Sequence, residues 1–263
     1  MSATISSIHY CPVKSISYQS VENCNINKNI GLVDDRIFAF AKDLNLNEAN
    51  LFEQNPEYRK GKWNKILTLK NTPVLNKYNF LLNKNKLTLI LNDKNILTID
   101  SNQSNERQKL SNKINELEKT INNKIILMKN ENFPFYDTSI SNKVDFVNSI
   151  SLLNTESIKD FEKKINKKIE RSIFRGNVCI EGVEAWKERE WIGKTLKINN
   201  VSFKVEKNIP RCVAINLKPK SDDNSFNLLQ LLKKTYNHFD MGIYLTALEN
   251  GDFKVNDQIE IKK

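Results

Sequence analysis

One cysteine in this chain has neighbours that could activate its thiol. Cys212 directly follows Pro210 and Arg211 in the stretch IPRCVAINLKP, and Lys207 lies a few residues before it. Proline restricts the backbone, and the two cations favour the thiolate, which is a nucleophile and a ligand for soft or high-valent metals. A cysteine can equally be a small hydrophobic residue buried in a strand. The residues alone leave both interpretations open, and the choice decides whether this protein does chemistry.

Arginine is the second signal, because it occurs only seven times in a chain dominated by lysine. Arg36, Arg175 and Arg211 each stand at the start of a predicted strand or beside a turn. The planar fork of arginine donors binds phosphate through two hydrogen bonds, which lysine cannot do. Ordinary ion pairs at the surface or between domains would also explain any one of these arginines.

The remaining thiols and the two histidines favour structural roles. Cys179 lies in a predicted core strand, Cys24 has no activating neighbour, and Cys11 precedes a proline in YCPVKS. His9 falls in an alternating strand and His238 follows a helix, so surface or structural roles are predicted for both. There is no CxxC or HExxH, which excludes the usual zinc sites and argues against a zinc hydrolase.

Composition points to a globular protein in a reducing compartment. The 263 residues can bury a sizeable core, and the net charge is +10. The lysines are spread along the whole chain, which favours a solvated surface with some bias toward anionic ligands; nucleic acid is not expected as a partner. The sequence shows no signal peptide, no apolar run of membrane-spanning length and no glycine-rich phosphate loop, so a soluble, cytoplasmic protein with free thiols and no membrane contact is predicted.

Alternating apolar and polar residues predict mostly strands in the first half. Residues 3–42 read as three short strands, and further strands are predicted at 62–69, 78–83, 86–91, 95–100 and 124–129. Apolar residues spaced by four, three and four predict a helix from 104 to about 122. A loosely patterned stretch, 131–144, is the predicted linker.

The second half repeats this mixture of strands and a few helices. Helices are predicted at 155–168 and 225–236, and strands at 147–153, 174–182, 194–207 (a hairpin turning at Asn199 and Asn200), 211–217, 241–248 and 252–263. Strands outnumber helices and do not alternate regularly with them. The predicted fold class is therefore mainly β with peripheral helices (α+β), not a Rossmann sheet.

Several motifs occur in an order that resembles one family. The opening ISSIHYCPVKSISYQSVENCNINKNIGLVDDRIFAF resembles the N-terminal β-barrel that precedes MOSC domains, and FRGNVCIEG, W-IGKTLKI, PRCV, GIY and KVNDQIEI resemble the MOSC domain itself. The resemblance implies an N-terminal β-barrel domain over residues 1–130 packed on a MOSC β-barrel over 131–263. The chain as a whole is similar to the mitochondrial amidoxime reducing component and its bacterial relatives.

This resemblance implies a molybdenum-dependent oxidoreductase, independent of pyridoxal phosphate, that reduces small N-hydroxylated compounds such as amidoximes, hydroxylamines and N-hydroxylated bases. Its cofactor would be the molybdenum cofactor (Mo-molybdopterin). Electrons would come from a separate donor protein: a flavin reductase, a ferredoxin or a b-type cytochrome. Cys212 would bind molybdenum as the catalytic residue, and the cofactor-binding positions would be Lys14, Ser15, Arg36, Arg175, Asn177, Ile209, Pro210, Arg211 and Tyr244.

The chain also departs from the family pattern. Gly176 replaces the proline of FRPN, Ile209 replaces a cysteine, Lys218 stands where an aspartate is common, and Asp34 replaces the glycine of GDR. Two other readings compete with a reductase: a molybdenum-cofactor or sulfur carrier that uses Cys212 without reductive turnover, and, more weakly, a basic nucleic-acid-binding barrel.

Overall fold

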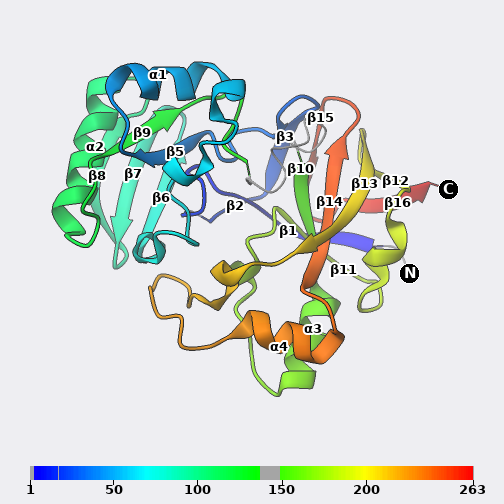
Figure 1. The fold of residues 1–263 in the computed structure, drawn as a ribbon. Helices are drawn as coiled ribbons and strands as arrows, with labels where there is room; N and C mark the ends of the chain where they lie inside the picture. The colour runs from blue at the N-terminus through cyan, green and yellow to red at the C-terminus, as the bar shows by residue number, and fades with distance from the viewer. Residues whose placement is uncertain (1–2, 17, 137–148, 263) are drawn as a thin grey trace.

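The computed structural model describes residues 3–16, 18–136 and 149–262. Its two parts lie side by side (Figure 1): a barrel built mainly from the C-terminal half, and an N-terminal part that comprises residues 36–136. Strands predominate and helices lie at the periphery of the described residues. The predicted mainly β fold class is therefore confirmed.

The elements of the described residues are as follows. The strands are β1 (Ala3–Tyr10), β2 (Gln19–Val21), β3 (Asn23–Asn27), β4 (Gly31–Leu32), β5 (Phe38–Lys42), β6 (Tyr78–Asn83), β7 (Lys86–Leu91), β8 (Lys94–Asp100), β9 (Ile125–Lys129), β10 (Ser149–Asn154), β11 (Val178–Glu181), β12 (Thr195–Ile198), β13 (Val201–Pro210), β14 (Asp240–Ala247), β15 (Gly251–Lys254) and β16 (Gln258–Lys262). The α-helices are α1 (Leu46–Gln54), α2 (Ser104–Leu117), α3 (Thr155–Ile165) and α4 (Leu228–Tyr236). Short 3-10 helices are η1 (Pro56–Arg59), η2 (Trp63–Lys65), η3 (Pro73–Lys77), η5 (Arg171–Phe174), η6 (Lys187–Trp191) and η7 (Val213–Asn216).

Seven strands close into a barrel. They follow the order β11, β10, β14, β13, β12, β16 and β1, and the pairing of β1 with β11 completes the ring. Neighbouring strands are antiparallel, except that β10 and β11 run parallel. The barrel thus takes one strand from the first ten residues of the chain.

Strand β1 belongs in this barrel because its apolar residues face the interior. Ala3 and Ile5 are buried, as are Ile8 and Tyr10, although these two pairs are out of phase for a simple alternation. A register shift between Ile5 and Ser7 places an extra residue in the strand. Such a bulge moves the alternation by one residue, so both pairs contribute to the same core.

The N-terminal part packs its own core under α1 and α2. Strand β5 pairs with β9, and β6, β7 and β8 form a three-stranded sheet. Helix α2 contacts β8 and β9 and contributes Leu110 and Ile114 to the core, as its predicted apolar face requires. Ile121, beyond the end of α2 at Leu117, also packs against this core.

The described strands of the N-terminal part do not close into a ring of their own. The described strands of residues 36–136 pair as a two-stranded and a three-stranded sheet, because β1 is paired in the C-terminal barrel and β3 pairs with β15. Both of those pairings cross the predicted boundary between residues 130 and 131. The division into domains 1–130 and 131–263 stays a prediction, since residues 137–148, which include most of the predicted linker, lie outside the described residues.

Three local predictions were wrong. Helix α1 was not predicted; it begins with a capping box in which Asn45 and Glu48 each accept from the other's backbone amide. The segment 62–69, predicted as a strand, forms η2 and then only a single bridge, between Ile66 and Ala41. The segment 211–217, also predicted as a strand, turns into η7 after β13 ends at Pro210.

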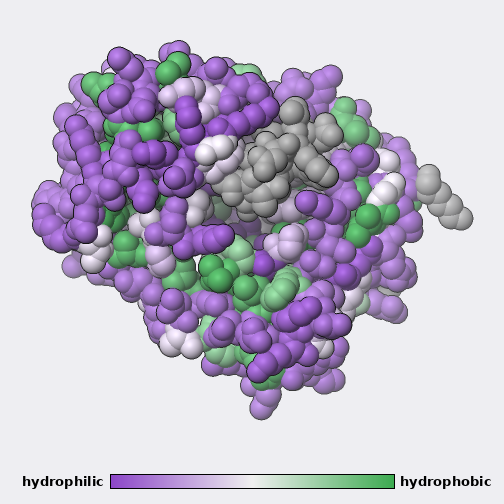
Figure 2. Space-filling model, viewed as in Figure 1, coloured by the Kyte–Doolittle hydropathy of each residue, from purple (hydrophilic) through white to green (hydrophobic). Residues whose placement is uncertain are grey.

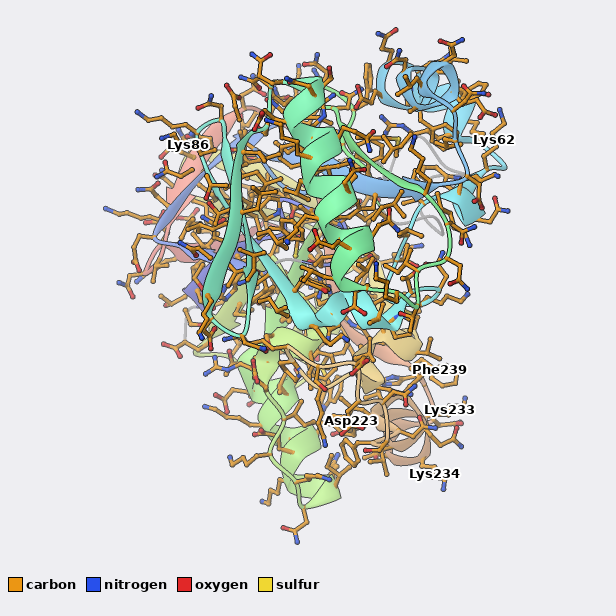
Figure 3. The ribbon with its side chains drawn as sticks, turned by 90° about the vertical axis from the view of Figure 1, so that its left-hand side faces the viewer. Lys62, Lys86, Asp223, Lys233, Lys234 and Phe239 are labelled. Atoms are coloured by element: carbon orange, nitrogen blue, oxygen red, sulfur yellow. The ribbon has the colours of Figure 1, made fainter. Side chains whose placement is uncertain are left out.

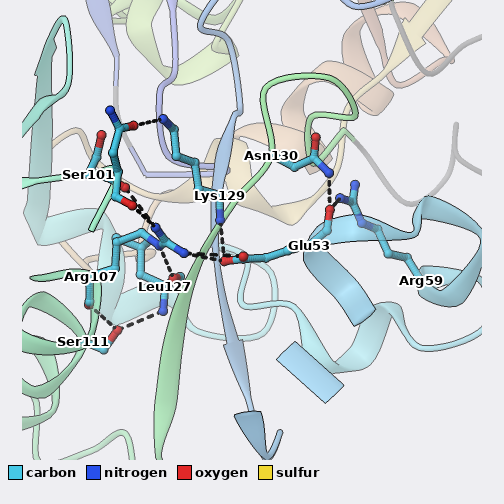
Figure 4. A network of polar contacts seen from close by, with 9 residues as sticks. Glu53, Arg59, Ser101, Arg107, Ser111, Leu127, Lys129 and Asn130 are labelled. Carbon is cyan, nitrogen blue, oxygen red and sulfur yellow. Dashed lines mark hydrogen bonds and ion pairs between the residues drawn. The ribbon is translucent and has the colours of Figure 1, made fainter. Parts of the chain in front are cut away.

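A polar network joins α1, α2 and β9 within the N-terminal part (Figure 4). The Glu53 carboxylate accepts from the guanidinium of Arg107 and from the backbone amide of Lys129 at 3.0 Å in each case. Arg59 donates to the backbone carbonyls of Phe52, Glu53, Phe133 and Pro134, and its guanidinium lies 4.1 Å from the centre of the Phe135 ring. The network therefore fixes the chain just before Tyr136, which reaches the candidate site.

Positive charge is distributed over the surface, as the sequence predicts. Lys62 and Lys86 lie at one end of the molecule, and Lys233 and Lys234 at the other (Figure 3). None of the described helices is both long and apolar enough to span a membrane.

Candidate active site

One pocket between the N-terminal part and the barrel is lined by all the residues that the family resemblance assigns to the cofactor and the metal. We call it the central pocket. Figure 1 shows the chain after β13 near the centre of the molecule, between the N-terminal part and helices α3 and α4, and apolar surface gathers there in Figure 2. The predicted residues that line it are Lys14, Ser15, Arg36, Arg175, Asn177, Ile209, Pro210, Arg211, Cys212 and Tyr244.

Lys14 brings a buried ammonium group to one wall. Its side chain is 5% exposed, and its Nζ donates to the carbonyl oxygen of Tyr136 at 2.6 Å. The backbone amide of Lys14 donates to Phe38 O, which attaches this turn to β5. The next residue, Ser15, has a φ of +66°, so the chain turns sharply at the pocket.

Arg36 lies beside Lys14 and is held by a buried carboxylate. Its Nε donates to Asp35 Oδ2 at 2.7 Å, and its Nη2 lies 2.6 Å from the same oxygen. The guanidinium also lies 5.0 Å from the centre of the Tyr136 ring. The other Asp35 oxygen accepts from the backbone amide of Cys11 at 2.8 Å. Asp35 thus orients the arginine and ties it to the end of β1.

Asn177 connects Arg36 to the barrel. Its Oδ1 accepts from Arg36 Nη2 at 3.2 Å, from the backbone amide of Ser151 at 3.0 Å and from the Ser151 hydroxyl at 2.8 Å. Its Nδ2 donates to the carbonyl of His9 at 3.2 Å. One asparagine therefore links β10, β1 and the arginine. Asn177 is buried, and its bonds to Ser151 are shielded from water, whereas those to Arg36 and His9 are partly buried.

Arg175 ends η5 in the left-handed conformation, with a φ of +53°. Its Nη2 lies 3.5 Å from Cys11 Sγ, within hydrogen-bond distance for sulfur. Burial raises the pKa of Cys11 even though the charge of Arg175 acts in the opposite direction. Cys11 is therefore a neutral thiol at neutral pH, in contact with a cation in the same pocket.

Gly176, the residue before Asn177, leaves no space for a side chain. A Cβ on Gly176 would lie 2.4 Å from Leu153 Cδ1, so any side chain there must displace a buried leucine. The departure from the family's proline at this position thus has a packing explanation.

Arg211 braces the pocket wall. Its Nη1 donates to the carbonyl of Phe174 at 2.7 Å, and its Nε donates to the carbonyl of Met241 at 2.9 Å. These bonds hold the end of η5 against the start of β14. Arg211 therefore lines the pocket while its guanidinium joins two backbone segments.

Cys212 is the exposed cysteine, whereas Cys11, Cys24 and Cys179 are buried. It stands at the N-cap of η7 in an extended conformation, where its carbonyl accepts from the amide of Ile215. The alternative that Cys212 is a buried hydrophobic residue in a strand is therefore wrong. Its neighbour Ile209 is buried against Tyr244.

His9 is fixed by hydrogen bonds and by a stacked tyrosine, which agrees with a structural role. His9 hydrogen-bonds the hydroxyls of Ser7 and Ser20, and its ring stacks on Tyr18 at 4.3 Å. Burial and the positive charge of Arg171 lower the pKa of His9 to about 4. In the described part of the chain, no three His, Cys, Asp or Glu side chains come together as a metal cluster.

Sequence reasoning missed several residues of the pocket. Cys11 and Asp35 both line it, and their positions next to PVKS and Arg36 were the signals that could have identified them. Ser151 also lines the pocket, but it comes from β10 and its sequence context carries no signal. The structure alone brings it to Asn177.

Comparison with protein families finds a match in the C-terminal half of this chain. The MOSC domain model matches residues 143–260, which include strands β10 to β16. The match therefore covers the C-terminal residues of the central pocket, from Ser151 to Tyr244.

Two curated relatives carry the same name. The chain is 27% identical over 144 residues to mitochondrial amidoxime reducing component 2 of Bos taurus, covering 49% of this chain and 42% of that protein. It is 33% identical over 70 residues to mitochondrial amidoxime reducing component 2 of Rattus norvegicus, covering 27% of this chain and 20% of that protein. The chain thus spans less than half the length of the curated relatives it matches.

Two solved structures align with this chain at lower sequence identity. The YUAD protein from Bacillus subtilis aligns with a TM-score of 0.44 at 10% identity, covering 99% of this chain and 96% of that chain. YiiM from Geobacillus stearothermophilus aligns with a TM-score of 0.35 at 13% identity, covering 43% of this chain and 54% of that chain.

Proposed function

We propose that this chain, whose C-terminal half is a MOSC domain, is a molybdenum-cofactor-dependent oxidoreductase that reduces small N-hydroxylated compounds. One observation carries the proposal: residues chosen from separate motifs in both halves of the sequence line a single pocket. The names of the curated relatives support the reaction class.

The residues of the pocket fit a cofactor that combines a phosphate with a metal. Lys14, Arg36 and Arg175 bring positive charge to the pocket, and an anion is favoured where several cations converge. Cys212 supplies an exposed thiol, and thiolate is a ligand for molybdenum-like soft or high-valent metals. We therefore assign Cys212 to the metal and Lys14, Ser15, Arg36, Arg175, Asn177, Ile209, Pro210, Arg211 and Tyr244 to the remainder of the cofactor.

The protein's own contribution is binding and orientation. Asp35 and Asn177 hold the Arg36 guanidinium in one place, so that its charge is preorganised before any ligand arrives. Arg211 fixes the backbone on both sides of the pocket through the carbonyls of Phe174 and Met241. Cys11 keeps a proton on its Sγ, because burial raises its pKa.

The bound molybdenum cofactor would supply the two-electron chemistry that removes oxygen from an N–O group. In the balanced reaction, two electrons and two protons are taken up, the N–O bond breaks, and the amine or amidine product and water are released. The electrons would come from a separate donor protein: a flavin reductase, a ferredoxin or a b-type cytochrome.

The test is to express the full chain in a host that makes the cofactor. We expect stoichiometric molybdenum and reduction of benzamidoxime and hydroxylamine with an artificial electron donor. Cys212→Ser should lose both, whereas Cys24→Ser, at a buried thiol of β3 outside the pocket, should keep both. A folded wild-type protein without molybdenum would contradict the proposal.

A cofactor or sulfur carrier is the second candidate, and the exposure of Cys212 favours it, because a carrier must present its thiol to a partner protein. A carrier would load and release the cofactor reversibly while reducing none of the N-hydroxylated compounds. Measurement of cofactor exchange and turnover on the same preparation separates the two functions.

A further inference from the structure

A second pocket adjoins the central pocket, and we call it the side chamber. The two share Leu69, Ile173, Arg175 and Ala214. The other residues of the side chamber come from both parts of the molecule. Among the described residues that we assign to the cofactor, Arg175 is the single one that also lines the side chamber. The chamber therefore extends the site away from Lys14 and Cys212.

Two tyrosines line the side chamber, and other parts of the protein fix both. The hydroxyl of Tyr18 donates to the carbonyl of Gly176 at 3.0 Å, and its ring stacks on His9. The hydroxyl of Tyr78 donates to Glu118 Oε1 at 2.7 Å. The hydroxyl protons of both tyrosines are thus engaged outside the chamber, which leaves the rings as its wall.

The remaining wall is largely apolar. Ile16, Leu69 and Leu217 line the chamber and are buried. The Asn76 side chain also lines it, but its Nδ2 donates to the carbonyls of Lys218 and Ser221 at 2.8 and 2.6 Å and so holds the loop after η7 in place. The amide group of Asn76 is thus engaged by the protein's own backbone. A ligand in the side chamber would therefore contact mainly carbon atoms.

Charged residues at the chamber's exposed rim interact with other parts of the protein. Lys220 Nζ forms an ion pair with Asp93 at 2.7 Å, and the Glu170 carboxylate accepts from the Ser172 hydroxyl at 2.5 Å. Because Lys220 and Glu170 carry opposite charges, the rim favours neither a positively nor a negatively charged ligand. Their exposure also leaves the chamber open to ligands from solvent.

We propose that the side chamber binds a planar, uncharged ring of the substrate, so that the N-hydroxylated group of the same molecule extends past Arg175 into the central pocket. The inference rests on the proposed function and deepens it. Fixed aromatic and aliphatic walls with few available polar groups are typical of sites that bind a flat apolar body. The cofactor also contains a planar ring, but of the described residues assigned to it only Arg175 lines the side chamber, whereas all of them line the central pocket.

The test fills the chamber from its rim. Ser172 lines the side chamber and not the central pocket, and Trp at this position would occupy the space of a ring. We expect Ser172→Trp to lower the ratio of kcat/KM for benzamidoxime over kcat/KM for hydroxylamine at least about tenfold, because only benzamidoxime carries a ring. Ser225→Trp, at an exposed position outside both pockets, is the matched control and should keep the ratio within about twofold of wild type.

A binding measurement separates failure of this inference from failure of the proposed function. Saturation-transfer NMR of benzamide with the purified full chain should show binding for wild type and Ser225→Trp and none for Ser172→Trp. If benzamide binds with this pattern but the protein reduces no N-hydroxylated compound, the ring-binding role of the side chamber is supported and the proposed reductase function is refuted. If the protein is a reductase but the substrate ratio and benzamide binding are the same in all three proteins, the proposed ring-binding role of the side chamber is refuted.

Two further measurements complete the experiment. Molybdenum and pterin contents are compared between Ser172→Trp and wild type; a loss of pterin from the folded variant would assign the chamber to the cofactor ring and overturn the proposal. If Ser172→Trp does not fold, Pro219→Trp fills the chamber from another segment, since Pro219 also lines the chamber and not the central pocket. It should give the same fall in the substrate ratio.

Discussion

The carboxylate of Asp35 should determine both the stability of the protein and the charge of the central pocket. Asp35 is 2% exposed, and its two oxygens serve different partners. One accepts from Arg36 Nε at 2.7 Å, and the other accepts from the amide of Cys11 at 2.8 Å. Asp35→Asn keeps the shape but removes the charge, and its amide group would face one of these donors.

The magnitude follows from the burial of the pair. Removing one partner of a buried ion pair typically costs about 3–5 kcal/mol of the free energy of unfolding. Arg36 keeps its contacts with Asn177 and Tyr136, and its side chain is 19% exposed, so the lower end applies. We expect a loss of about 3 kcal/mol. At about 2–4 °C per kcal/mol for a chain of this size, Tm should fall by about 6–12 °C.

The assay is thermal unfolding of the full chain, with molybdenum content measured in parallel. Asp34→Asn is the matched control, because Asp34 is exposed and has a φ of +66°, a conformation that asparagine tolerates well. Its Tm should remain within about 1 °C of wild type. We expect Asp35→Asn also to lose cofactor, since Arg36 would lose the carboxylate that orients its guanidinium. Equal Tm values for the two variants would refute the assigned role of Asp35.

The remaining predictions concern packing and pH. Gly242 and Gly61 both have positive φ, but a Cβ on Gly242 would lie 2.4 Å from Leu152 O, whereas nothing lies within 4 Å of one on Gly61. In urea denaturation we expect Gly242→Ala to cost at least about 3 kcal/mol and Gly61→Ala about 1–2 kcal/mol, and equal costs would exclude the steric explanation. Burial and the charge of Arg171 lower the pKa of His9 to about 4. The native state therefore binds fewer protons than the unfolded state between about pH 4 and 6.5. The free energy of unfolding should decrease as pH falls from about 6.5 toward 4. In His9→Gln this loss should be smaller, as measured by urea denaturation at both ends of that range; an unchanged loss would attribute the pH dependence to other groups.

Residues of the central pocket were predictable where short motifs mark them. Lys14, Arg36 and Cys212 stand beside prolines, turns and neighbouring charges that are visible in the sequence, and all three line one pocket. Ser151 could not be predicted, because its role depends on its distance from Asn177, a residue 26 positions later. Asp35 was visible as a neighbour of Arg36, but its burial was not.

The alternation of apolar residues by itself determined that this chain is mainly β, and the spacing in α2 determined which helix face is buried, because both properties depend on residues close together in the chain. Tertiary structure alone decided that β1 completes the C-terminal barrel, since a strand edge can pair with any partner of suitable register. It likewise decided that Cys212 is exposed at the start of η7, and that the side chamber lies beyond Arg175. These features depend on segments that are distant in sequence and meet only when the barrel and the N-terminal part pack together.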